Sequence, residues 1–133
     1  MDGGVARDDG GAAVVEFVLV SIPLLFLLLG VLQVAAYLHL RNVVVASAAE
    51  GARYGANADR PSAAGGPFAE QVLSRGVSAR TAAGIRCSAT EEAGTGGTVL
   101  VAVRCRGSLP TFLSMLGDLL PVDAQARAIK EGR

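Results

Sequence analysis

The chain has one long apolar stretch near its amino terminus, followed by shorter segments in which apolar and polar positions alternate. Residues 17–32 read FVLVSIPLLFLLLGVL, and the apolar character continues with one glutamine through Leu38. A helix over residues 17–40 would be about 36 Å long at 1.5 Å per residue, which exceeds the ~30 Å hydrocarbon core of a bilayer. The stretch predicts a transmembrane helix, which Pro23 is expected to bend.

Helical spacing continues past the apolar stretch to about residue 58, and no proline occurs between Pro23 and Pro61. Small residues recur every four positions on this extension. The two rows are Ser47, Gly51 and Gly55, and Ala48, Ala52 and Ala56. Such rows let another backbone approach closely. They fit a helix of another subunit or the protein's own domain, and the pattern leaves both open.

Two further helices are predicted downstream. Residues 60–67 have the composition of a loop, and residues 68–75 place apolar side chains at helical spacing with Gly76 as the C-cap. Residues 109–120 also have apolar side chains at helical spacing. The apolar face of this second segment fits packing on the sheet, and a partner or membrane surface is the alternative.

Strand patterns fill the rest of the second half. Residues 85–90 and 98–106 predict two strands around the glycine-rich turn 94–97, and residues 122–129 alternate as a third strand would. The expected fold class is α+β. It consists of an N-terminal transmembrane helix extended beyond the membrane, then a small domain with an antiparallel sheet of about three strands and short helices.

The chain has two cysteines, Cys87 and Cys105, one in each of the first two predicted strands. They fall opposite each other if the turn centres on Gly96, which favours a disulfide over a free cytosolic pair. A disulfide closing a loop of about 19 residues would contribute roughly 3 kcal/mol. It would also place the domain outside the cytoplasm.

Composition and charge exclude several functions. The 133 residues are 51% hydrophobic and 18% charged, with 12 basic and 12 acidic side chains, so the basic stripe of a nucleic-acid binder is not expected. No Ser/His/Asp set, metal-ligand cluster or phosphate-binding loop stands out, and His39 near the end of the apolar helix is expected to be an interfacial side chain. We therefore predict no enzyme activity, no cofactor, no metal and no small-molecule substrate.

A cleaved secretory signal is the main alternative to a membrane anchor. Small-residue sites at 34–36 and 46–48 could imitate its cleavage site. However, residues 1–11, MDGGVARDDGG, have one arginine against three aspartates, and the apolar stretch is longer than a signal needs. These features favour the anchor.

Glu16 lies at the edge of the apolar stretch, where a carboxylate drawn toward the bilayer centre costs on the order of 2–3 kcal/mol. One interpretation is an interfacial charge stabilised by the positive end of the helix dipole. The other is a partner for a positive group within the apolar phase. A free α-amino group made by cleavage just upstream would be such a group.

Two motifs flank the apolar helix and resemble a known family. Gly11, which is followed by four residues and then by Glu16 and Phe17, resembles the prepilin-peptidase motif of the Tad (tight adherence) system. After the helix, residues 48–54, AAEGARY, resemble the AREGARYA-like signature of TadE-like proteins. The resemblance implies a minor pseudopilin or pilus-assembly component that a prepilin peptidase cuts after Gly11. Ala12 would then be the first mature residue and Glu16 the fifth.

The resemblance also implies a domain organisation and partners. Residues 1–11 would be a leader that is removed, 12–58 the transmembrane helix with its extracytoplasmic extension, and 59–133 a small extracytoplasmic α+β domain. The expected partners are the membrane, the prepilin peptidase, and other pseudopilins or Tad assembly-platform proteins. The alternative is an uncleaved, membrane-anchored binding or secretion-accessory domain. The leader departs from the family pattern, because Arg7 is its only basic residue.

Charges near the helix conflict with this orientation. Arg7 precedes the helix, whereas Arg41, Arg53 and Arg60 follow it, so the positive-inside rule would place the domain in the cytoplasm. The expected disulfide and the resemblance favour the opposite. We therefore expect a single-pass cell-membrane protein with a cytoplasmic amino terminus and an extracytoplasmic domain, with a surface pilus as one destination.

Overall fold

The computed structural model describes residues 9–109 and 120–132. The elements, in chain order, are α1 (Asp9–Ala56), the 3₁₀ turn η1 (Ser62–Ala64), α2 (Gly65–Gly76), α3 (Ala79–Ala83), β1 (Ile85–Ala93), the 3₁₀ turn η2 (Thr95–Gly97), β2 (Val99–Leu109) and β3 (Leu120–Ile129). A long apolar helix, short helices and a three-stranded antiparallel sheet confirm the predicted α+β class. The chain divides into two units, Met1–Ala35 and Ala36–Arg133.

Helix α1 is one continuous α-helix of 48 residues that includes Pro23. Its residues up to Leu32 are almost entirely exposed, and its buried residues begin at Val44. Only the carboxyl-terminal part of α1 therefore belongs to the domain core. The predicted extension past the apolar stretch is confirmed, and the helix ends at Ala56.

The sheet has the order β1-β2-β3, and both neighbouring pairs are antiparallel. Residues Cys87 and Cys105 lie opposite each other, which is the predicted register. The turn between β1 and β2 places Gly96 and Gly97 at positive φ, a conformation that glycine adopts without steric cost. The glycine-rich turn thus fixes the register that brings the two sulfur atoms together.

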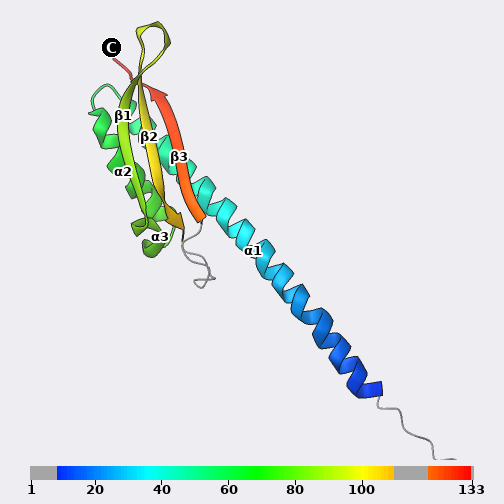
Figure 1. Cartoon of the computed structure of the whole chain (residues 1–133). Helices are drawn as coiled ribbons and strands as arrows, with labels where there is room; N and C mark the ends of the chain where they lie inside the picture. The colour runs from blue at the N-terminus through cyan, green and yellow to red at the C-terminus, as the bar shows by residue number, and fades with distance from the viewer. Residues whose placement is uncertain (1–8, 110–119, 133) are drawn as a thin grey trace, which may run out of the picture. The chain divides into compact units, whose positions relative to one another are not determined.

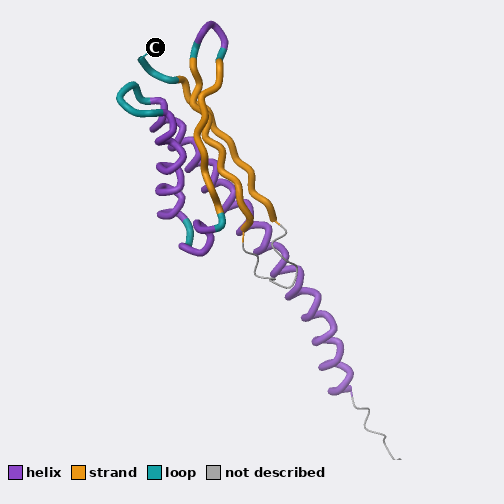
Figure 2. Tube along the Cα trace, turned by 60° about the vertical axis from the view of Figure 1, so that its left-hand side comes forward, coloured by secondary structure: helices purple, strands orange, loops and turns teal. Residues whose placement is uncertain are grey.

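One face of the sheet is covered by helices (Figures 1 and 2). Within the second unit, α2 and the carboxyl-terminal part of α1 lie behind the three strands in Figure 1, and the turned view in Figure 2 shows the same two layers. The core between the layers comprises Val44, Ala48, Ala52, Ala69, Leu73, Ile85, Val103, Cys105, Val122 and Ala124. Small side chains dominate this core, so the layers pack closely.

The helices after α1 differ from the prediction in three respects. Helix α2 begins at Gly65 rather than at residue 68, within the segment expected to be a loop. Gly76 is the last helical residue rather than the cap, since the cap is Val77, with extended dihedral angles and its N–H bonded to the Leu73 carbonyl. Helix α3, which was not predicted, is a single turn whose N-cap Ser78 accepts a hydrogen bond from the Thr81 N–H.

The predicted helix over residues 109–120 lies mostly outside the described residues. Its two end residues belong to strands in the structure, because Leu109 pairs with Leu120 at the end of the β2–β3 ladder. The third strand is confirmed, and it begins two residues before the predicted start at residue 122.

Candidate functional site: the amino-terminal helix and its junction with the domain

The first part of α1 presents large apolar side chains around its whole circumference. Phe17 and Leu19 are each 72% exposed and Phe26 is 70% exposed, and the most apolar window of the helix has no buried residue. A helix that is hydrophobic all round belongs in a lipid or protein environment rather than in water. By length and composition it can cross a membrane.

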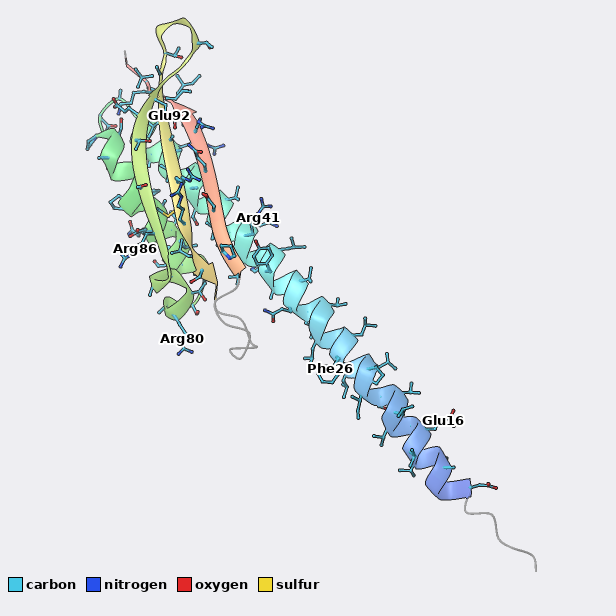
Figure 3. All side chains as sticks on the ribbon, in the orientation of Figure 1. Glu16, Phe26, Arg41, Arg80, Arg86 and Glu92 are labelled. Atoms are coloured by element: carbon cyan, nitrogen blue, oxygen red, sulfur yellow. A yellow bond between two sulfur atoms is a disulfide. The ribbon has the colours of Figure 1, made fainter. Side chains whose placement is uncertain are left out.

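Glu16 is the one formally charged side chain between Asp9 and Arg41. It is exposed on the surface of α1, and Figure 3 shows its carboxylate directed away from the helix axis. Phe17 follows on an adjacent part of the helix surface. A carboxylate among exposed apolar side chains is stable in a membrane only at the interface or beside a positive group.

The predicted processing residues Gly11 and Ala12 lie in the first turns of α1, and both are exposed. A protease must unwind the backbone of the bond that it cuts. Glycine destabilises a helix interior by roughly 1 kcal/mol relative to alanine, so Gly10 and Gly11 make this turn easier to open than the turns after it. The geometry at the helix start is compatible with cleavage after Gly11.

Residues 48–54, the second motif, form the junction between α1 and the domain. Ala48, Gly51 and Ala52 are buried, whereas Glu50 and Arg53 are exposed and form an ion pair at 3.8 Å. A side-chain carbon added at Gly51 would lie 2.5 Å from the Gly65 carbonyl oxygen. The α1 and α2 backbones therefore touch at this glycine, and a larger residue has no room.

The two small-residue rows serve the protein's own domain in this structure. Ser47, Gly51 and Gly55 are buried beside Ala48, Ala52 and Ala56. A carbon added at Gly55 would meet the Ser62 carbonyl oxygen at 2.7 Å and the Val101 side chain at 3.2 Å. Of the two alternatives left open by the sequence, packing on the domain is the one that the structure contains.

Tyr54 closes the junction on its other side. Its ring stacks on Phe68 of α2 with the ring centroids 4.0 Å apart and the planes nearly parallel. The Arg60 guanidinium lies 4.3 Å from the Tyr54 ring centroid and also donates a hydrogen bond to its hydroxyl. The tyrosine of the motif thus fixes the chain as it leaves α1 and returns in α2.

The end of α1 is capped from a distant part of the sequence. The Lys130 ammonium donates hydrogen bonds to the carbonyls of Gly55, Asn57 and Arg60 at 2.9, 3.2 and 2.6 Å, and the Glu131 N–H donates to the Ala56 carbonyl at 2.8 Å. These bonds satisfy carbonyls that a helix end leaves free and place a positive charge at the negative end of its dipole. Sequence reasoning missed this cap because it joins residues about 70 positions apart, and no local pattern marks it.

Cys87 and Cys105 form a disulfide between neighbouring strands, with their Cα atoms 4.0 Å apart. On the uncovered face beside it, the Arg104 Nε donates a hydrogen bond of 2.8 Å to Asp123, and the Arg106 Nε lies 3.5 Å from the same carboxylate. The hydrogen bond from Arg104 lowers the pKa of the Asp123 carboxyl, and the positive charges of Arg104 and Arg106 lower it further. The carboxylate also raises the pKa of Arg104.

No group of His, Cys, Asp or Glu side chains that could hold a metal ion occurs within residues 9–109 and 120–132. His39 is exposed on α1.

An apolar amino-terminal helix that runs into a small disulfide-linked α+β domain is compatible with a single-pass membrane protein. Residues 11–53 match the family model described as TadE-like protein, which confirms the resemblance that the motifs indicated. The matched segment starts at Gly11 and ends within the second motif, so it contains nearly all of both motifs and the helix between them. No curated protein and no solved structure matches the chain.

Proposed function

We propose that the protein is a minor pseudopilin or assembly component of a Tad-type pilus. In this proposal a prepilin peptidase cuts after Gly11, and the mature protein assembles through its amino-terminal helix. The observation that carries the proposal is the isolated carboxylate of Glu16, placed five residues after Gly11 on a helix that is otherwise exposed and apolar. The match of this segment to the TadE-like family supports it.

The physical role of Glu16 follows from its surroundings. Cleavage after Gly11 would create a positive α-amino group on Ala12, one helical turn before Glu16 or on the same residue of a neighbouring subunit. Two opposite charges within an apolar phase attract strongly, and removing either one leaves the other unpaired at high cost. The apolar surface would supply the assembly energy, and the Glu16 pair would set the register between helices.

The burial of the small-residue rows bears on where such assembly contacts would form. The small-residue rows at Ser47–Ala56 are occupied by α2 and the sheet, so contacts with other subunits would have to use the exposed part of α1 before them. This is the stretch that also crosses the membrane in the proposal. Release from lipid and packing against other helices would then use the same side chains.

The proposed orientation is a cytoplasmic amino terminus and an extracytoplasmic domain. The Cys87–Cys105 disulfide supports it, since such bonds persist outside the reducing cytoplasm. The proposed role is structural rather than catalytic. The second candidate, an uncleaved membrane-anchored accessory domain, would keep the helix and the disulfide and would leave Glu16 as an interfacial charge.

Substitutions at the two proposed positions separate the steps. Gly11→Trp should block processing, so that the protein keeps its full-length mass in the membrane. Glu16→Gln should allow processing but reduce incorporation into sheared pilus material. Processing that continues unchanged in the Gly11 variant would contradict the proposed cut.

A matched control keeps the composition of the helix constant. The double exchange Val15→Glu with Glu16→Val preserves charge and hydropathy but rotates the carboxylate by about 100° around the helix. The exchange should behave like Glu16→Gln in assembly. Normal incorporation of the exchanged variant would show that assembly needs a carboxylate only somewhere near the interface, and it would contradict the proposed pairing of Glu16 with the α-amino group.

A further inference from the structure

The charges of the domain are distributed unevenly between its two ends. We call the end at which α1 enters the domain the basal end. It is defined by contacts within the second unit: the Tyr37 hydroxyl donates to the Pro121 carbonyl at 3.4 Å, Gly76 lies against Val43, and Gly84 lies against Ser108. The opposite end contains the β1–β2 turn and the carboxyl terminus of α1.

The basal end is rich in arginine. The strand register places Arg86 opposite Arg106, with Arg104 and Asp123 next to them, in the half of the sheet near this end. Among the described residues the basal half of the domain has six arginines and two carboxylates, and the far half has four basic side chains and five carboxylates. The six arginines, all exposed, are Arg41, Arg75, Arg80, Arg86, Arg104 and Arg106.

These arginines come from five elements that reach the basal end, namely α1, α2, α3, β1 and β2, whereas β3 contributes Asp123 there. Figure 3 shows Arg41 on α1, Arg80 on α3 and Arg86 on β1 with their side chains directed outward near this end, whereas Glu92 lies toward the other. Three of them also border a recess on the uncovered face of the sheet, about 350 Å³ in volume and lined by Arg86, Ser88, Arg104 and Arg106 together with Cys87.

Few acids neutralise this group within the described part of the chain. The Asp123 carboxylate pairs with both Arg104 and Arg106. One oxygen of the Glu70 carboxylate lies 3.9 Å from Arg86, and the other accepts a hydrogen bond from the Cys87 N–H. Arg41 and Arg80 have no ion pair among the described residues. The basal end therefore has more guanidinium groups than carboxylates among the described residues, and Arg41 directly follows Leu40 at the end of the apolar stretch of α1.

We propose that the basal end of the domain docks on anionic phospholipid headgroups of the membrane that α1 spans. The inference rests on the proposed function only in requiring that span. Arginine pairs with phosphate through two parallel hydrogen bonds, and basic side chains within a Debye length of an anionic surface are attracted to it. Each arginine in contact should favour docking by about fivefold. The six arginines of the basal end would hold the domain against the bilayer before assembly.

The docking can be measured by chemical modification of arginine in the intact protein. The full chain is reconstituted into phosphatidylcholine vesicles, or into vesicles with one third phosphatidylglycerol, and treated with phenylglyoxal. Peptide mapping then gives the modification rate of each arginine. In the phosphatidylglycerol vesicles Arg41, Arg80 and Arg86 should react at least fivefold more slowly, and 0.5 M NaCl should restore their rates.

Arg53, whose side chain is 76% exposed in the far half, is the internal control and should react at the same rate in both vesicles. In the double variant Arg86→Gln with Arg106→Gln the equilibrium constant for docking should fall by about 25-fold, so that Arg80 loses its protection. Arg53→Gln should leave the protection of Arg80 unchanged. Equal rates in both vesicles, or equal slowing of Arg53, would overturn the proposal. Protection only in native membranes would also overturn it and would indicate an acidic protein partner instead.

Flotation of the vesicles in alkaline carbonate separates this inference from the proposed function. A chain that floats with the lipid but shows no arginine protection refutes headgroup docking and leaves the membrane span intact. A chain that is extracted by carbonate refutes the span, and headgroup docking with it.

Discussion

At Gly51 the structure predicts how a substitution changes the free energy of unfolding. A Cβ atom added there would lie 2.5 Å from the Gly65 carbonyl oxygen and 2.7 Å from the Ala69 Cβ. Both neighbours belong to the α2 backbone or its first side-chain atom, so neither can rotate away. Gly51→Ala would force α1 and α2 apart by about 1 Å to restore ordinary contact distances.

The expected loss follows from two opposing contributions. Overpacking a close helix contact costs about 1–3 kcal/mol, and replacing glycine by alanine within a helix returns about 1 kcal/mol. The added carbon meets backbone that cannot rotate away, so the upper half of the overpacking range, about 2–3 kcal/mol, applies here. We therefore expect Gly51→Ala to lower the free energy of unfolding by about 1–2 kcal/mol. For a domain of this size the midpoint of thermal unfolding would fall by about 5–15 °C.

Circular dichroism of the full chain in detergent micelles measures this shift. Gly30→Ala is the matched control, because it makes the same substitution in the same helix where no atom lies within 4 Å. The control should not lower the midpoint. A Gly51 variant as stable as the unaltered protein would refute the close contact between α1 and α2 and, with it, the structural explanation of the glycine in residues 48–54.

Three further predictions concern the domain. Lys130→Met should lower the free energy of unfolding by about 1–2 kcal/mol in urea titrations, because the carbonyl of Gly55 in α1 and those of Asn57 and Arg60 just after it lose a charged donor. Replacing Cys87 and Cys105 together by alanine should lower the free energy of unfolding by roughly 3 kcal/mol. The unaltered protein in reductant should be as stable as this double variant, and an unaltered protein whose stability does not change in reductant would contradict the prediction. The hydrogen bond from Arg104 lowers the pKa of Asp123, so its contribution to stability is full above the unfolded pKa near 3.9 and is lost as the pH falls through the lowered folded value. Asp123→Asn should therefore be less stable than the unaltered protein at pH 7, and this difference should shrink as the pH falls below the unfolded pKa. A difference that stays constant with pH would exclude the ion pair as its cause.

Local patterns were sufficient for the elements that depend on local physics. The apolar stretch predicted α1, and the alternation of β-branched residues with the glycine turn predicted the β1–β2 hairpin and its register at Cys87 and Cys105. The register could be predicted because a turn with glycines at positive φ leaves few ways to pair the strands. The strands run farther than predicted, to Ala93 and Leu109, because pairing with a neighbour extends residues that have little strand preference of their own.

Features that depend on contacts across the chain were not predictable. Gly65 and Gly66 look like loop residues in sequence, yet they are helical because their small size lets α2 approach α1 and β1. Carbon atoms added there would meet the Gly51 carbonyl oxygen at 2.6 Å and the Cys87 carbonyl oxygen at 2.9 Å. The Lys130 cap and the stack of Tyr54 on Phe68 were missed for the same reason. For the functional segment, the sequence predicted the chemistry of Gly11 and Glu16, and the structure adds their exposure on a continuous helix.

The intact mass of the protein extracted from its native membrane tests the central claim most directly. The account predicts a mature chain that lacks residues 1–11 and begins at Ala12, with the mass of two oxidised cysteines. A full-length chain would contradict processing and favour the uncleaved anchor. A chain that lacks all residues up to about Ala36 or Ala48 would contradict both readings and indicate a secreted domain.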